Sequence, residues 1–169
     1  MKKSLVLLTF LFSIQSLLIS QELLNKQSSF AGKKSFHDIQ YGLSLVFSEI
    51  GPIPAMDLAT THRFRIGSRF SLGAGVSTIY FVTLTPYAYT RIDIKSRYEQ
   101  FRAVPYFYLK AGYLIYLIES ESDSNSIHLE PGFGYSFLSK RRSTSWTVFI
   151  AANSFQGRIF PKTGVAFEF

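Results

Sequence analysis

The sequence contains no cysteine, and its 11 acidic residues are outnumbered by 18 lysines and arginines. Without cysteine, the chain can form neither a disulfide framework nor a thiolate metal site. The net charge of +7 is compatible with nucleic-acid binding. However, the sequence has no basic helix, zinc motif or lysine-rich run, so we expect no nucleic-acid partner. The length of 169 residues suits a single domain.

Long apolar runs are absent from the sequence except at its start. Lys2 and Lys3 precede an apolar core, and the small residue Ser20 ends it before a suitable cleavage point. Polar residues interrupt this core, which falls short of the ~20 apolar residues that a membrane-spanning helix needs. We therefore predict a cleaved secretory signal peptide over residues 1–20, with a retained membrane anchor as the alternative. The polar residues 21–35 are expected to form a flexible segment in the periplasm.

Aromatic residues are abundant, with 17 Phe and 10 Tyr. After residue 35, apolar and polar side chains alternate, which is the pattern of strands whose two faces meet different surroundings. Turn residues separate the alternating segments, among them a predicted loop at residues 49–55 that contains Pro52 and Pro54. The expected strands cover residues 36–48, 56–67, 70–80, 84–95, 102–118, 127–138, 144–153 and 161–169. This pattern predicts an all-β fold, an eight-stranded antiparallel up-and-down β-barrel.

Such a barrel can hide its apolar face inside, as a soluble lipocalin-like binder does, or turn it outward to membrane lipid. The glycines favour the second arrangement, because they share the polar face of their strands. On a solvated surface they would weaken the strands, whereas inside a narrow barrel they make room for Arg, Tyr and Glu side chains. The glycines on this face are Gly42, Gly67, Gly73, Gly75, Gly112, Gly132, Gly134 and Gly164. We therefore predict a transmembrane barrel over residues 36–169, with the soluble lipocalin-like barrel as the alternative.

Charged residues on the polar face of this barrel would point into its lumen. An unpaired charge buried there is very costly, so we expect these residues to form a network of ion pairs that fills the barrel. A narrow ion path through the same residues is the alternative. The predicted members of the network are Arg63, Arg65, Arg91, Asp93, Lys110, Glu130 and Glu168. A lumen of eight strands filled by side chains leaves no aqueous channel.

A family resemblance rests on the signal peptide, the alternating strands, the final Phe169 and the segments Leu72–Val76 and Glu130–Tyr135. Together these features resemble the small outer-membrane β-barrel proteins of Gram-negative bacteria. The resemblance is architectural. It implies an outer-membrane location, both ends of the barrel on the periplasmic side, and contact with outer-membrane lipids and lipopolysaccharide. We expect a monomer.

The same resemblance concerns how the barrel would be assembled. In this family the aromatic last strand is the signal that the barrel-assembly machinery reads. The residues that would carry this signal here are Val165, Phe167 and Phe169. Because the family includes structural, adhesive and lipid-modifying members, the fold alone does not decide the function.

A lipid-modifying enzyme is an alternative to a structural or surface-interaction protein. His37, His62 and His128 are the candidate bases near neutral pH, and His128 shares a strand face with Glu130. A lipid A deacylase of the same barrel size would carry a His-x-Ser-Asn type motif on a late strand. Here the Asn153-Ser154 pair has no neighbouring histidine, so we predict a non-enzymatic protein that needs no cofactor.

Two features do not follow from the barrel pattern. Strict alternation directs His62 toward lipid beside Phe64, so we expect either a β-bulge there or a position near the outer interface. The acidic stretch Glu119–Asn125 resembles a calcium loop but lacks the glycine and terminal glutamate of an EF-hand. We interpret it as a solvated loop and expect no metal site. A weak divalent-cation contact with lipopolysaccharide phosphates is the alternative.

Overall fold

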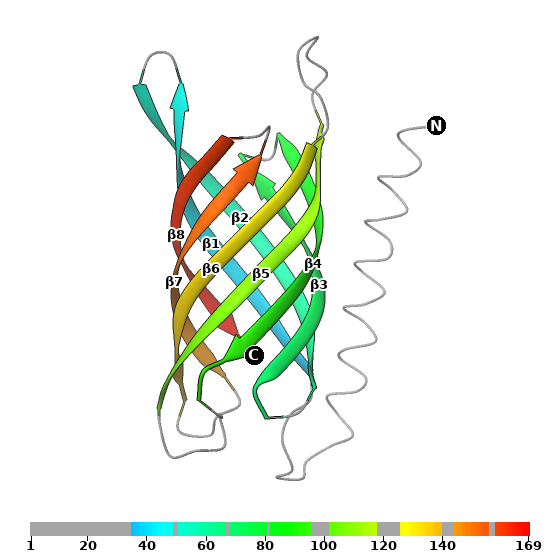
Figure 1. The fold of residues 1–169 in the computed structure, drawn as a ribbon, viewed down its shortest axis with the longest axis vertical. Coiled ribbons are helices and arrows are strands. Elements are labelled where there is room, and N and C mark those ends of the chain that lie inside the picture. Colours follow the sequence, from blue (N-terminus) through cyan, green and yellow to red (C-terminus); the bar gives the residue numbers. More distant parts are fainter. Residues whose placement is uncertain are drawn as a thin grey trace, which may run out of the picture. The chain divides into compact units, whose positions relative to one another are not determined.

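The computed structural model describes residues 35–48, 51–66, 68–80, 82–95, 102–117, 126–139, 144–155 and 158–169. These residues form a closed antiparallel barrel in which each strand pairs with its neighbours in sequence and β1 pairs with β8 (Figure 1). The strands are β1 (Ser35–Ser48), β2 (Gly51–Ile66), β3 (Phe70–Ile79), β4 (Thr83–Asp93), β5 (Ala103–Tyr116), β6 (Ser126–Leu138), β7 (Ser145–Phe155) and β8 (Arg158–Glu168). The predicted eight-stranded up-and-down barrel is therefore confirmed. Within the described ranges, no helix is long and apolar enough to cross a membrane.

Parts of the sequence-based interpretation lie outside the described residues. They are the predicted signal peptide, residues 21–34 of the predicted periplasmic segment, and the acidic stretch Glu119–Asn125. The predicted segment ended at Ser35, which is already the first residue of β1.

The strands alternate between buried and exposed side chains, and the polarity of the two faces is the reverse of that in a water-soluble barrel. In β4, for example, Tyr87, Tyr89, Arg91 and Asp93 are buried, whereas Ile92 is exposed. The interior thus holds many charged side chains and the tyrosines Tyr87, Tyr89, Tyr106 and Tyr108, and most of the large aliphatic residues face outward. This arrangement is the one predicted from the position of the glycines.

Two strands begin earlier than predicted. β2 begins at Gly51, so Pro52 and Pro54 belong to a strand instead of the predicted loop at residues 49–55. The reason is that β2 pairs with β3 only from Asp57 onward, which leaves this part of β2 an edge where proline is tolerated. Gly51 itself has a φ of 118°, a conformation that glycine adopts readily. Likewise β8 begins at Arg158, before the predicted start of its strand at residue 161.

The extension of β1 and β2 forms a two-stranded ribbon beyond the rest of the barrel. β1 pairs with β8 only as far as Ser44, whereas its ladder with β2 continues to Ser48 opposite Gly51. Figure 1 shows this ribbon rising beyond its neighbours at the upper left. Its exposed side chains include Leu45 and Ile53.

His62 lies on the outward face, and the expected β-bulge is absent there. It pairs with His37 of β1 and with Ala74 of β3 in ladders that continue without a bulge on both sides. It lies at the end of the barrel that carries Phe169, because His37 and Phe169 exchange two backbone hydrogen bonds of 2.9 Å. This is the end that we expected to face the periplasm, so the second expected explanation, a position near the outer interface, would require the opposite orientation of the barrel.

Candidate functional site

The candidate functional site is the barrel lumen, where charged side chains from many strands are buried. The structure places all the residues of the predicted charge network on this inward side. They form two groups. We call the first the arginine cluster: Arg63, Arg65, Arg91, Asp38, Asp93 and Glu168. We call the second the lysine cluster: Lys110, Lys162, Asp57 and Glu130.

Arg63 of β2 is the centre of one half of the arginine cluster. Its Nε lies 2.9 Å from Oδ2 of Asp38 on β1, and its Nη2 contacts the carboxylate of Glu168 on β8. The guanidinium is fully buried. Its planar fork of N–H donors suits such paired recognition of two carboxylates. Arg63 therefore links β2 to both β1 and β8, the two strands that pair to close the barrel.

Arg91 of β4 is the centre of the other half. Its Nε donates to Oδ1 of Asp93 at 2.6 Å, and its Nη2 donates to Oγ of Ser136 on β6 at 2.8 Å. The guanidinium also lies 3.6 Å from the centroid of the Tyr106 ring, which is a cation–π contact. Arg65 reaches the other oxygen of Asp93 at 3.4 Å. The arginine cluster thus spans the lumen from β1 to β6.

The lysine cluster converges on the carboxylate of Glu130 on β6. Its Oε1 lies 3.0 Å from Nζ of Lys110 and accepts a hydrogen bond of 2.9 Å from the Tyr108 hydroxyl. Its Oε2 lies 2.8 Å from Nζ of Lys162, which is also 2.9 Å from Oδ1 of Asp57. Every charge of the lysine cluster thus has a partner of opposite sign.

A layer of aromatic rings fills the lumen between and beside the two clusters. Tyr87, Tyr89, Tyr106 and Tyr108 are buried together with Phe149, and the rings of Tyr89 and Tyr108 stack with centroids 5.8 Å apart. We call these five residues the aromatic layer.

The inward glycines make room for this aromatic layer, because each tyrosine lies opposite a glycine of a neighbouring strand. The opposed pairs are Tyr87 with Gly75 and Gly112, Tyr89 with Gly73, Tyr106 with Gly134, and Tyr108 with Gly132. A Cβ atom at Gly134 would lie 2.6 Å from the Tyr106 ring, which is closer than real Cβ atoms come. The prediction that these glycines make room for luminal side chains is therefore confirmed.

Three charged residues of the two clusters were not predicted: Asp38, Asp57 and Lys162. All three share the inward parity of their strands, so the alternation that identified the other members also applies to them. Asp57 and Lys162 were overlooked although both lay within predicted strands, each as the second residue from the predicted start of its strand. Asp38 was overlooked because its strand face was read from the uncharged residues that follow it.

The residues considered for catalysis are divided between the two faces of the barrel. His128 is buried in the lumen with its Nε2 3.9 Å from Oε2 of Glu130. Asn153 is buried, whereas the adjacent Ser154 lies on the opposite face of β7 and is partly exposed. Among the described residues, no group of three or more His, Cys, Asp or Glu is arranged to hold a metal ion.

No family model matches the sequence, and no curated protein matches it. The structure is similar to the N-terminal β-barrel domain of OprF from Pseudomonas aeruginosa, with a TM-score of 0.58, 12% identity, and coverage of 82% of this chain and 99% of that one. It is also similar to Neisserial surface protein A, with a TM-score of 0.52, 14% identity, and coverage of 79% and 92%. A structure from the de novo design of transmembrane β-barrels gives a TM-score of 0.51 at 10% identity, with coverage of 82% and 98%. At these identities the likeness shows the fold alone.

Proposed function

We propose that this chain spans the outer membrane as a closed, non-enzymatic β-barrel with a structural or surface-interaction role. The observation that carries this proposal is the reversed polarity of the barrel. Trp146 and Ile150 are 61% and 62% exposed on the outside, whereas Arg63 and Lys110 are 0% exposed inside. In water such an apolar exterior would be an aggregation hazard, whereas hydrocarbon accepts it at no cost. A soluble lipocalin-like barrel would have the opposite arrangement.

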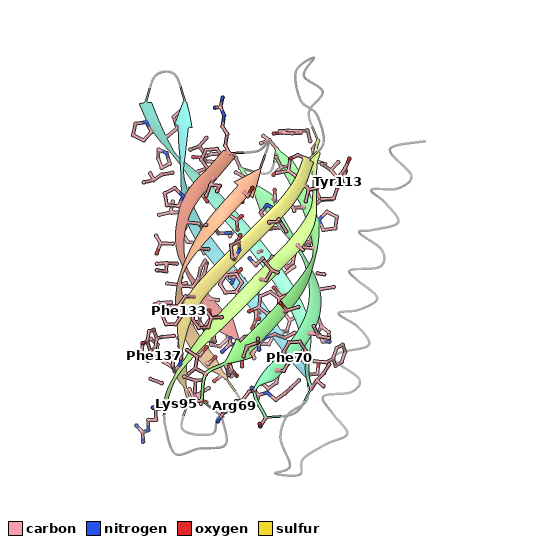
Figure 2. The ribbon with its side chains drawn as sticks, in the orientation of Figure 1. Arg69, Phe70, Lys95, Tyr113, Phe133 and Phe137 are labelled. Atoms are coloured by element: carbon pink, nitrogen blue, oxygen red, sulfur yellow. The ribbon has the colours of Figure 1, made fainter. Side chains whose placement is uncertain are left out.

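Features at the two ends of the barrel support a membrane-spanning position. Figure 2 shows Tyr113 near one end, and Phe70 and Phe137 near the other. Beyond these rings at the second end lie the cationic side chains of Arg69 and Lys95. Aromatic rings followed by cations match the polarity gradient of a membrane interface, where both residue types are favoured. Outer-membrane lipids and lipopolysaccharide are therefore the partners that we propose for this surface.

We further propose that the lumen does not conduct ions steadily. The aromatic layer and the two ion-paired clusters fill the lumen together, because Tyr106 contacts Arg91 and Tyr108 contacts Glu130. An eight-stranded barrel has no room for a channel beside them. In planar-bilayer recordings, the full chain folded in detergent should produce little or no steady conductance. Heat-modifiable migration on a gel should show that the inserted protein is a folded barrel. A large, stable open channel would contradict this proposal.

The lipid-modifying alternative makes a different prediction. A deacylase would change the acyl composition of lipid A, whereas a structural or surface-interaction protein would not. Mass spectra of lipid A from cells with and without the protein should therefore be identical. A loss of acyl chains that depends on the protein would establish the enzyme instead.

The β1–β2 ribbon, with Leu45 and Ile53 exposed, is the feature that supports a surface-interaction role.

Assembly by the barrel-assembly machinery through β8 is part of the same proposal. Val165 and Phe169 are exposed, and the Phe167 ring lies between those of Trp146 and Phe169, at 4.9 and 5.8 Å. Phe169→Asp should reduce the amount of folded barrel in outer-membrane fractions, because it places a charge where the machinery would read an aromatic ring. Phe169→Tyr is the matched control and should be mild. Wild-type amounts of Phe169→Asp would show that β8 is not read in this way.

A further inference from the structure

Two of the three histidines of the chain lie side by side on the outward face, where the barrel fold and the lumen give them no role. His37 of β1 and His62 of β2 are direct partners across the antiparallel ladder. Their ring centroids are 6.0 Å apart. Both residues are half-buried and lie at the end of the barrel that carries Phe169, the lower end in Figure 1. They are therefore close to each other and partly exposed near one end of the barrel.

Each imidazole is held through the same ring nitrogen. The Nε2 of His37 lies 2.9 Å from Oγ1 of Thr60, and the Nε2 of His62 lies 3.1 Å from Oγ of Ser35. If each Nε2–H donates to its hydroxyl, the lone pair of each ring resides on Nδ1. The Nδ1 of His37 is buried and has no hydrogen-bond partner. This arrangement is typical of metal-ligating histidines, in which the second nitrogen is oriented by a hydrogen bond and the first is left for the ion.

The surroundings restrict both rings. The Phe169 ring lies 5.2 Å from that of His37, and the Phe64 ring contacts that of His62 edge-on at 4.9 Å. Rings confined in this way lose little conformational freedom when they bind a ligand, which favours a preorganised site. Two imidazoles are enough protein ligands for such a site, because water can occupy the remaining coordination positions of a metal ion, and no carboxylate ligand is needed.

We propose that His37 and His62 form a two-imidazole site for a divalent transition-metal cation of the zinc, copper or nickel class. Neutral imidazole nitrogen is a ligand that these ions prefer, whereas Mg²⁺ and Ca²⁺ require oxygen ligands. With Zn–N bonds of about 2.0–2.1 Å and tetrahedral angles, two bound imidazoles have centroids ~5 Å apart. The observed separation of 6.0 Å needs only a small adjustment of the two rings. The site would explain why a histidine occupies an outward position beside Phe64.

The test is a calorimetric titration of Zn²⁺ into the untagged full chain folded in detergent micelles. We expect one Zn²⁺ per chain, and an excess of Mg²⁺ should not displace it. His37→Ala and His62→Ala should each weaken binding at least tenfold. His128→Ala is the matched control and should bind like the wild type, because His128 is buried in the lumen. Heat-modifiable migration on a gel identifies the variants that fold. Absence of Zn²⁺ binding, or wild-type affinity in both outward variants, would overturn the site.

A spectroscopic measurement tests the assignment of the nitrogens independently of affinity. In ¹⁵N NMR spectra, Zn²⁺ should shift the Nδ1 resonances of both His37 and His62. Electron paramagnetic resonance of the Cu²⁺ complex should show two bound imidazole nitrogens, and one in either single variant. Thr60→Val keeps both ligands but removes the hydroxyl that orients His37, so it should weaken binding about tenfold. One nitrogen in the wild type, or shifts confined to His128, would overturn the proposal.

Discussion

The two charge clusters of the lumen are both neutral, but the barrel assembles them in opposite ways. The arginine cluster contains three cations and three carboxylates, and the lysine cluster contains two of each. In the lysine cluster, Lys110 and Glu130 are direct partners across the β5–β6 ladder, so neighbouring strands attract each other. In the arginine cluster, Asp38 and Glu168 are direct partners across the β1–β8 ladder. Two like charges directly opposite each other destabilise a strand pair.

This difference assigns a specific role to Arg63. The β1–β8 ladder is the closure of the barrel, and the two carboxylates that face each other there would repel without a cation between them. Arg63 reaches both from β2. The two carboxylates of the lysine cluster do not face each other across a ladder, and Glu130 has Lys110, Lys162 and the Tyr108 hydroxyl as partners. We infer that replacing Arg63 alone weakens the pairing of β1 with β8, whereas replacing one residue of the lysine cluster does not.

The largest expected effect follows from removing Arg63. Arg63→Met removes the guanidinium that lies 2.9 Å from Asp38 and contacts Glu168, so the two facing carboxylates lose the cation that they share, and Glu168 keeps the more distant Arg91, whose Nη1 is 3.7 Å from its Oε2. Breaking a buried ion pair in this way should lower the free energy of unfolding by about 3–5 kcal/mol. The measurement is urea-induced unfolding of the barrel in micelles, followed by heat-modifiable migration on a gel.

A second substitution tests whether the repulsion at the closure is the cause. Asp38→Asn in the Arg63→Met background removes one of the two facing charges, so it should restore part of the lost stability. If the double variant is less stable than Arg63→Met alone, the repulsion between Asp38 and Glu168 is not what Arg63 relieves.

Removing Lys162 should have a smaller effect. In Lys162→Met, Glu130 loses one ammonium at 2.8 Å but keeps Lys110 and the Tyr108 hydroxyl, whereas Asp57 loses the ammonium that lies 2.9 Å away. A buried carboxylate that loses its partner costs at least the ~1–3 kcal/mol of an uncharged group, and we expect the loss to stay below that of Arg63→Met because no facing carboxylate adds repulsion. The same unfolding experiment measures this loss. A loss as large as that of Arg63→Met would remove the distinction between the two clusters.

The sequence predicted which side chains enter the lumen but not which of them meet. Alternation along each strand is a local property, so it identified Arg63, Lys110 and Glu130 as inward without knowledge of the neighbouring strands. The pairing of Asp38 with Glu168 depends on the register of β1 against β8, which is set by closure of the whole barrel. The pairing of His37 with His62 has the same origin in the β1–β2 register.

The limits of β2 and β8 were wrong for a different reason. Pro52 and Pro54 are ordinary signals of a loop, and they are tolerated in β2 only because that part of the strand has no partner on its second side. The sequence shows the prolines but not the extent of the neighbouring β3. Asp57 was therefore placed at the start of a strand and was not recognised as a partner of Lys162.

The smallest expected loss of stability concerns the aromatic layer. It compares a substitution on the inner face of the barrel with one on the outer face. Gly75 lies opposite Tyr87, and a Cβ atom there would come within 2.6 Å of the Tyr87 hydroxyl oxygen. That hydroxyl is held by a hydrogen bond of 2.8 Å with Thr61, so the ring cannot move aside freely. Gly75→Leu should therefore overpack the lumen and lower the free energy of unfolding by about 1–3 kcal/mol. Ala74→Leu is the matched control on the exposed face of β3, where the added apolar bulk enters detergent or lipid and should have little effect. Urea unfolding of both variants in micelles measures the difference. If Ala74→Leu destabilises the barrel while Gly75→Leu is tolerated, the lumen has space that the packing of Tyr87 does not show, and the closed interior would have to be abandoned.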